Sequence, residues 1–192
     1  MASKPLIVAI AFALAGAVAN AQPVEIEGVG FEPTAQIGGQ ILQLNGAGLR
    51  TRAIFKVYAA GLYVPQKTNS AAALLAQKGP RRVAITMLRD VDADAFAGAV
   101  SDGLTANHTQ QQLAGFEAQI ETLKANLKAI GEAKEGSVVH FDFTPEAGTR
   151  ILVNGEQKGV SILGADFFTA VLRNWIGENP VDVGLKRRLL GL

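Results

Sequence analysis

The stretch LRTRAIFKVYAAGLYV, residues 49 to 64, places cationic and phenolic side chains among residues that are typical of a buried β-sheet. These polar residues are Arg50, Arg52, Lys56, Tyr58 and Tyr63. A guanidinium withdrawn from water needs a partner, because an isolated charge in apolar surroundings is very costly. Arginine can hold a carboxylate through two parallel hydrogen bonds. The segment therefore indicates either a site for an anionic ligand or a solvated polar strand face, and its spacing leaves both interpretations open.

The geometry of a strand limits which of these side chains can share a site. In one regular strand, Arg50, Arg52, Lys56 and Tyr58 point to one face of the sheet, because successive side chains alternate. Arg50 and Tyr63 would then lie on opposite faces, roughly 40 Å apart. They could share a site only if the chain turned back near residues 51–54 or bent at a bulge around residue 61.

Other catalytic and metal chemistry has little support in the sequence. Two histidines, His108 and His140, are a poor basis for a metal site, so we expect neither a metal nor a cofactor. The absence of cysteine excludes thiolate ligands, thiol nucleophiles and disulfides. Neither a G-x-S-x-G nucleophile turn nor a phosphate-binding loop is present. Asp90, Asp92 and Asp94 stand at the start of an expected helix. Carboxylates at this position stabilise the N-terminal end of the helix dipole.

The first 21 residues have the composition of a secretory signal, with Lys4 before an apolar run that ends in Ala19-Asn20-Ala21. We expect cleavage after Ala21, a periplasmic location, no stable membrane anchor afterwards, and one domain over residues 22–192. An uncleaved anchor is the alternative. Removing Lys4 from the 18 basic residues leaves 17, against 17 acidic residues. This balance argues against a nucleic-acid partner, whose phosphates attract clustered cations.

The elements that must position these residues follow from periodicity and turn signals. Strand patterns occupy residues 24–31, 40–65, 81–88, 137–145 and 149–162, the last with a hairpin turn at Asn154-Gly155. Helical patterns occupy 69–79, two segments of 92–131 that separate near 106–108, then 164–177 and 183–191. In the second of the two segments, apolar residues recur along one helix of about five turns: Leu113, Phe116, Ile120, Leu123, Leu127 and Ile130. The order predicts an α+β fold with helices on one face of a mainly antiparallel sheet.

Residues 45–64, NGAGLRTRAIFKVYAAGLYV, resemble the chalcone isomerase-like family, whose enzymes carry Gly-Ala-Gly, a nearby Arg and a Phe-x-Lys-Phe-Thr-Ala-x-Gly-x-Tyr run. The matching positions are Gly46, Ala47, Gly48, Arg50, Phe55, Lys56, Ala59, Gly61 and Tyr63. A second, weaker match is TAVLRNWIGENPVDVGLK, residues 169–186. The resemblance implies an open-faced β-sandwich, in which a large antiparallel sheet is backed by helices and a ligand cleft lies between them.

The resemblance also implies roles for individual residues. In the isomerases, the Arg at the position of Arg50 holds a substrate oxygen, and a Thr at the position of Tyr58 orders water near the ketone. In fatty-acid-binding relatives, that Arg and the Tyr at the position of Tyr63 hold the carboxylate. Here Tyr58 replaces the Thr, Asn174 stands at a Ser/Thr position near the cleft, and residues 92–104 supply no Tyr and no Asn. Donors that would stabilise a developing enolate are therefore missing, and we assign no catalytic residue.

The main hypothesis is a non-catalytic periplasmic protein that binds a fatty acid or a similar apolar carboxylate. Arg50 is its ion-pair partner and Tyr63 its hydrogen-bond donor, and Tyr58, Asn174 and Trp175 are further candidates for the cavity wall. One alternative is an isomerase acting on a chalcone-like enone, with an altered site. The other is a structural or partner-binding envelope protein whose cleft is filled by its own side chains.

Overall fold

The computed structural model describes residues 22–192, so the expected signal at residues 1–21 lies outside the described part. Its centre is a seven-stranded sheet in which every neighbouring pair is antiparallel. The order across the sheet is β11 (Glu156–Ile162), β10 (Gly148–Val153), β9 (Val138–Thr144), β6 (Arg81–Met87), β5 (Phe55–Val64), β4 (Gln40–Arg52) and β3 (Thr34–Ile37). Two small sheets pair β1 (Val24–Ile26) with β2 (Val29–Phe31), and β7 (Val91–Asp92) with β8 (Glu132–Ala133).

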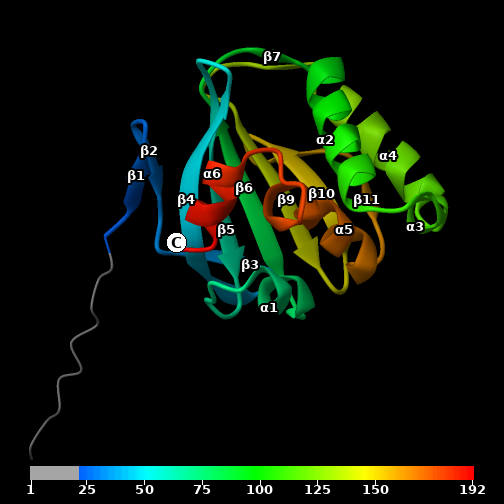
Figure 1. The fold of residues 1–192 in the computed structure, drawn as a ribbon, viewed down its shortest axis with the longest axis horizontal. Helices are drawn as coiled ribbons and strands as arrows, with labels where there is room; N and C mark the ends of the chain where they lie inside the picture. The colour runs from blue at the N-terminus through cyan, green and yellow to red at the C-terminus, as the bar shows by residue number, and fades with distance from the viewer. Residues whose placement is uncertain (1–21) are drawn as a thin grey trace, which may run out of the picture.

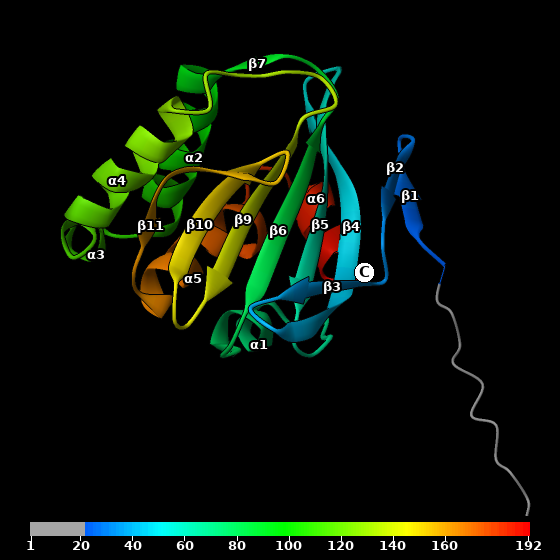
Figure 2. The same ribbon diagram turned by 180° about the vertical axis from the view of Figure 1, so that it is seen from behind.

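The helices gather on one face of this sheet, which confirms the expected α+β arrangement (Figure 1). They are α1 (Ala71–Ala76), α2 (Ala93–Asn107), α3 (Gln110–Ala114), α4 (Glu117–Lys128), α5 (Ala165–Ile176) and α6 (Val183–Leu189). Helix α6 packs on β4, α5 packs against α2, and α4 packs against α2 and β11. The opposite view leaves the strands largely uncovered, as an open-faced sandwich requires (Figure 2).

None of the helices within residues 22–192 combines the length and the apolar character needed to cross a bilayer.

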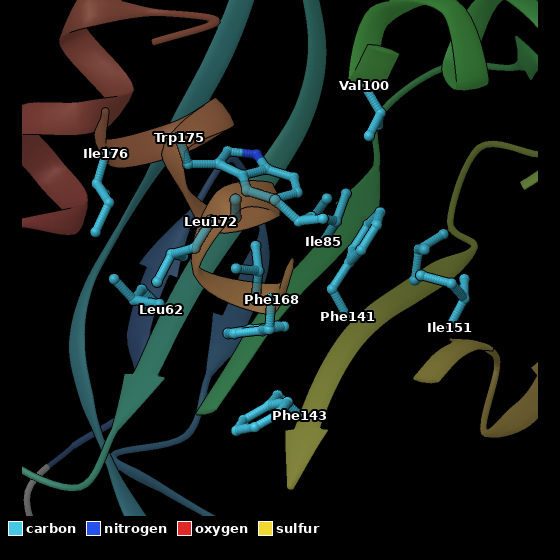
Figure 3. Packing of buried hydrophobic residues seen from close by; sticks show 14 of the residues in the cluster. Leu62, Ile85, Val100, Phe141, Phe143, Ile151, Phe168, Leu172, Trp175 and Ile176 are labelled. Atoms are coloured by element: carbon cyan, nitrogen blue, oxygen red, sulfur yellow. The ribbon is translucent and has the colours of Figure 1, made fainter. Parts of the chain in front are cut away.

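The main core lies between the sheet and the helices. Aromatic side chains of β9 meet those of α5: Phe141 packs edge-on against Trp175 at 5.2 Å, and Phe143 stacks on Phe168 at 5.1 Å between ring centroids (Figure 3). A smaller cluster, which includes Phe31, forms on the other face, where β1 and β2 lie. The two clusters explain why the strands are apolar on both faces near the sheet centre.

The second helical segment is shorter than expected, and the prediction of one continuous helix is wrong. Helix α3 ends at Ala114, where the N–H of Gly115 bonds back to the carbonyls of Gln111 and Leu113. Phe116 then takes φ −120°, outside the helical range, and α4 begins at Glu117. A glycine and a bend interrupt the helix although the apolar spacing continues across the break.

The Gly46-Ala47-Gly48 motif lies within β4 and permits the close approach of α6. A Cβ added at Gly46 would stand 2.0 Å from the carbonyl oxygen of Arg188, and one at Gly48 would stand 2.6 Å from the Cβ of Arg188. The buried amide of Asn45 also donates to the carbonyl of Leu189 at 2.6 Å. The motif is therefore a packing surface for α6, and the strand pairing with β5 also shifts register between Leu44 and Gly46, where the motif begins.

Gly46→Ala is expected to destabilise the protein by about 1–3 kcal/mol, because the obstructing atom belongs to the α6 backbone and cannot rotate away. Gly30→Ala is the matched control, since Gly30 is also a strand residue and a Cβ there meets nothing within 4 Å. Urea unfolding of both variants measures the difference. Equal midpoints for the two variants would refute this role of the motif.

Candidate ligand-binding site

A tight hairpin brings the polar residues of the opening stretch together. Strand β4 ends at Arg52 and β5 begins at Phe55, and Ala53 adopts a left-handed φ of 54° in the turn. The chain therefore turns back near residues 51–54, the first of the two options, and the geometry of one regular strand does not apply. Arg50 consequently lies directly opposite Tyr58 across the hairpin.

A cavity of about 280 Å³ opens between this hairpin, β6 and the helices α2 and α5. Its apolar walls are formed by Val57 and Met87 from the sheet, and by Ala95, Phe96, Ala99 and Val100 from α2. Its charged lining is Arg50, Arg52, Arg89, Asp90 and Asp92. The volume lies just below the range of roughly 300–1,000 Å³ that is usual for drug-sized ligands, so the cavity fits a small ligand with an apolar body.

Arg50 lacks a partner of its own in the protein. Its Nε atom is buried and makes no hydrogen bond within residues 22–192, and no carboxylate of that range lies within ion-pair distance of its guanidinium. The guanidinium carbon lies 5.6 Å from the centre of the Tyr58 ring. The ring offers a cation–π contact, but it does not replace an acceptor for the Nε–H group. A buried donor without an acceptor is costly, and an anionic ligand would remove that cost.

Tyr58 is held so that its hydroxyl proton can be donated to a ligand. The indole Nε1 of Trp175 donates to the Tyr58 oxygen at 2.9 Å, so the Tyr58 proton must point elsewhere. Among the described residues no acceptor for that proton is recorded. Burial raises the pKa of Tyr58 to about 12, although the neighbouring Arg50 opposes the shift. The hydroxyl therefore stays protonated at neutral pH beside an arginine.

Tyr63 lies elsewhere, and the expected pairing of Arg50 with Tyr63 does not occur. Tyr63 belongs to the small cluster on the outer face of the sheet, where its hydroxyl donates to the carbonyl of Glu32 at 3.0 Å. It does not line the cavity. Tyr58 and Tyr63 are separated by an odd number of positions in one strand, so they point to opposite faces, roughly 16 Å apart along β5.

Asn174 and Trp175 both line the cavity, and both come from the last turn of α5. The Asn174 amide donates to the carbonyl of Val100 at 3.2 Å, which ties α5 to α2. Its oxygen faces Gly103, where an added Cβ would stand 2.0 Å away. Trp175 lies above the sheet with Phe141 beside it and Val100 of α2 across from it (Figure 3).

Sequence reasoning missed several residues at the mouth of the cavity. Arg89 and Phe55 contact each other there, with the guanidinium carbon 4.9 Å from the ring centre. Asp92 caps α2 by accepting from the N–H groups of Asp94 and Ala95, as expected, but it also lines the cavity. Arg52 of the opening stretch, which was not a candidate for the cavity wall, lines the cavity as well. No local sequence pattern predicts that Arg89 lies at the cavity, because only the packing of β6 beside the hairpin places it there.

The sheet, its helical layer and the cavity between them define an open-faced β-sandwich that carries a ligand-sized site. The chain belongs to the chalcone isomerase-like family, whose model matches residues 23–191. Among solved structures, it is similar to the crystal structure of the Arabidopsis thaliana fatty-acid binding protein AtFAP1, with a TM-score of 0.63 and 16% sequence identity over 85% of this chain and 92% of that chain. A search of curated proteins finds no match. At this identity the likeness describes the fold.

Proposed function

We propose that the protein binds a fatty acid or a similar apolar carboxylate in the cavity between β4, β5, α2 and α5. The carboxylate pairs with Arg50 and accepts a hydrogen bond from Tyr58, and the acyl chain lies against the apolar wall of α2. The observation that carries the proposal is the half-buried Arg50, whose Nε is buried without a hydrogen-bond partner among the described residues and which lines an apolar cavity. The resemblance in fold to a fatty-acid binding protein supports it.

The proposed role is binding without catalysis, in the periplasm after removal of residues 1–21. An isomerase would need donors aimed at the developing enolate, and the α2 wall offers Ala95, Phe96, Ala99 and Val100 instead. No feature of the cavity favours the isomerase alternative specifically. The alternative of a structural or partner-binding envelope protein required a cleft filled by the protein's own side chains. The open cavity beside Arg50 does not agree with that requirement.

A comparison of two ligands tests the carboxylate contact. Trp175 is the single tryptophan of the chain and lines the cavity, so its fluorescence reports occupancy. We expect the protein to bind a saturated fatty acid at least about tenfold more tightly than the alcohol of equal chain length, because a hydrogen bond to a charged group contributes roughly 1.5–3 kcal/mol. Arg50→Gln should weaken binding of the fatty acid by about 10- to 100-fold and leave binding of the alcohol nearly unchanged.

Arg187→Gln serves as the control, because Arg187 is exposed on α6 and does not line the cavity. It should keep the wild-type preference for the acid. The proposal fails if the wild type binds neither ligand, if it binds acid and alcohol equally, or if Arg50→Gln retains the preference.

A further inference from the structure

The tip of hairpin β4–β5 exposes large apolar side chains. Ile54 is 88% exposed and Phe55 is 54% exposed, and every residue from Thr51 to Lys56 is open to solvent. The tip projects at the end of the molecule where β6 leads into β7 (Figures 1 and 2). Phe55 lines the mouth of the cavity, so the exposed apolar tip and the entrance are continuous.

The cations beside this tip lack acidic partners. Arg52 is exposed, and Arg89 lies over the Phe55 ring with its guanidinium carbon 4.9 Å from the ring centre. Within residues 22–192 no carboxylate lies in ion-pair distance of either guanidinium, whereas Lys56 is paired with Glu27 at 2.6 Å. Two arginines at the mouth can therefore meet an external anion.

The acidic groups near the mouth are already engaged inside the protein. Asp90 lies 3.8 Å from the ammonium of Lys134. Asp92 accepts two N–H groups at the start of α2. Asp182 accepts from the backbone and the hydroxyl of Thr51, at 3.0 and 3.2 Å. These acids are engaged within the protein, whereas Arg52 and Arg89 keep no carboxylate within ion-pair distance among residues 22–192 and can meet an external anion.

We propose that this hairpin tip docks on an anionic lipid bilayer. Ile54 and Phe55 enter the headgroup region, Arg52 and Arg89 meet lipid phosphates, and the cavity mouth faces the membrane. Two apolar side chains are far too few for a protein interface, which typically buries about 800 Å² per partner. Membrane-surface binding needs only a modest apolar insertion together with nearby cations. The proposal goes beyond ligand binding and does not depend on what occupies the cavity.

Vesicle binding tests the proposal with the chain from Gln22 to Leu192, which contains the complete described fold. We expect it to sediment with phosphatidylcholine vesicles that contain phosphatidylglycerol and not with phosphatidylcholine alone. Salt at about 1 M should release it, because the Debye length then falls to about 3 Å. Ile54→Asp should lower the partition coefficient roughly tenfold, through lost apolar insertion and added negative charge.

Ile41→Asp is the matched control, because Ile41 is 72% exposed and lies at the opposite end of β4. It should bind vesicles like the wild type, and circular dichroism should show both variants folded. Ile54 does not line the cavity, so Ile54→Asp should bind fatty acid in solution as the wild type does, which separates docking from ligand binding. The proposal is overturned by absent binding to anionic vesicles, by equal binding to neutral ones, or by equal losses in the two variants.

Discussion

Asp142→Ala is expected to lower the free energy of unfolding by about 3–5 kcal/mol, because it leaves a largely buried arginine without its counterion. Asp142 on β9 is 2% exposed, and it accepts two hydrogen bonds from Arg82 of β6, which is 17% exposed. Arg82 Nε lies 2.5 Å from one carboxylate oxygen, and Arg82 Nη2 lies 2.6 Å from the other. This two-bond pair joins neighbouring central strands on the outer face of the sheet.

The surroundings of the pair increase the expected loss. Asp142 stands between Arg82 of β6 and Arg150 of β10, which are its register partners on either side. The Nε of Arg150 is buried and makes no hydrogen bond within the described residues. Burial, and then the charge of Arg82, lowers the pKa of the nearby His140 to about 4, so His140 is neutral at pH 7. Without Asp142, two arginines would remain close together and largely withdrawn from water.

The double variant Arg82→Met with Asp142→Leu is the control for this prediction. A pair of apolar side chains of similar size removes both charges, and such replacements are often neutral or stabilising. Guanidinium unfolding at pH 7 should therefore show a large loss for Asp142→Ala and a much smaller one for the double variant. A loss below about 1 kcal/mol for Asp142→Ala would mean that water already solvates Arg82.

The elements that the sequence predicted well carry strong local signals. Asn154 and Gly155 take φ of 51° and 86° in the β10–β11 turn, the combination that Asn-Gly favours. Asn69 and Ser70 both precede the alanine-rich helix as possible caps, and Ser70 caps α1 through a hydrogen bond from the N–H of Ala73. Where local chemistry and tertiary structure agree, short segments are sufficient for the prediction.

The site was harder to predict because it depends on register. Residues 53–54, Ala-Ile, carry none of the usual turn residues, so the hairpin that creates the site has no local signal. The pairing register then shifts between Arg50 and Thr51, which changes the faces of the residues beyond it. Arg50, Tyr58, Asn174 and Trp175 were expected at the cavity and line it, whereas Tyr63 does not. Their role in binding a ligand stays a prediction.

Ala99→Phe is expected to weaken fatty-acid binding by roughly a hundredfold, about 2.7 kcal/mol, because the new ring would occupy the space proposed for the acyl chain. Ala99 lies on the face of α2 that lines the cavity, one turn after Ala95. The cavity has only about 280 Å³, so a phenyl group takes a large share of it. Trp175 fluorescence titration measures the loss, and thermal unfolding checks that filling the cavity leaves the fold intact.

Thr105→Phe places the same side chain on the same helix but outside the cavity, because Thr105 is exposed, does not line the cavity, and donates its hydroxyl to the carbonyl of Ser101. It should bind like the wild type. Ala99→Phe and Arg50→Gln probe different parts of one ligand, since the first excludes the acyl chain and the second removes the partner of the carboxylate. Ala99→Phe should weaken binding of the acid and of the alcohol equally, while Arg50→Gln should weaken binding of the acid alone. That result would mean that Ala99 and Arg50 contact the same bound molecule. Unchanged binding by Ala99→Phe would place the acyl chain outside this cavity.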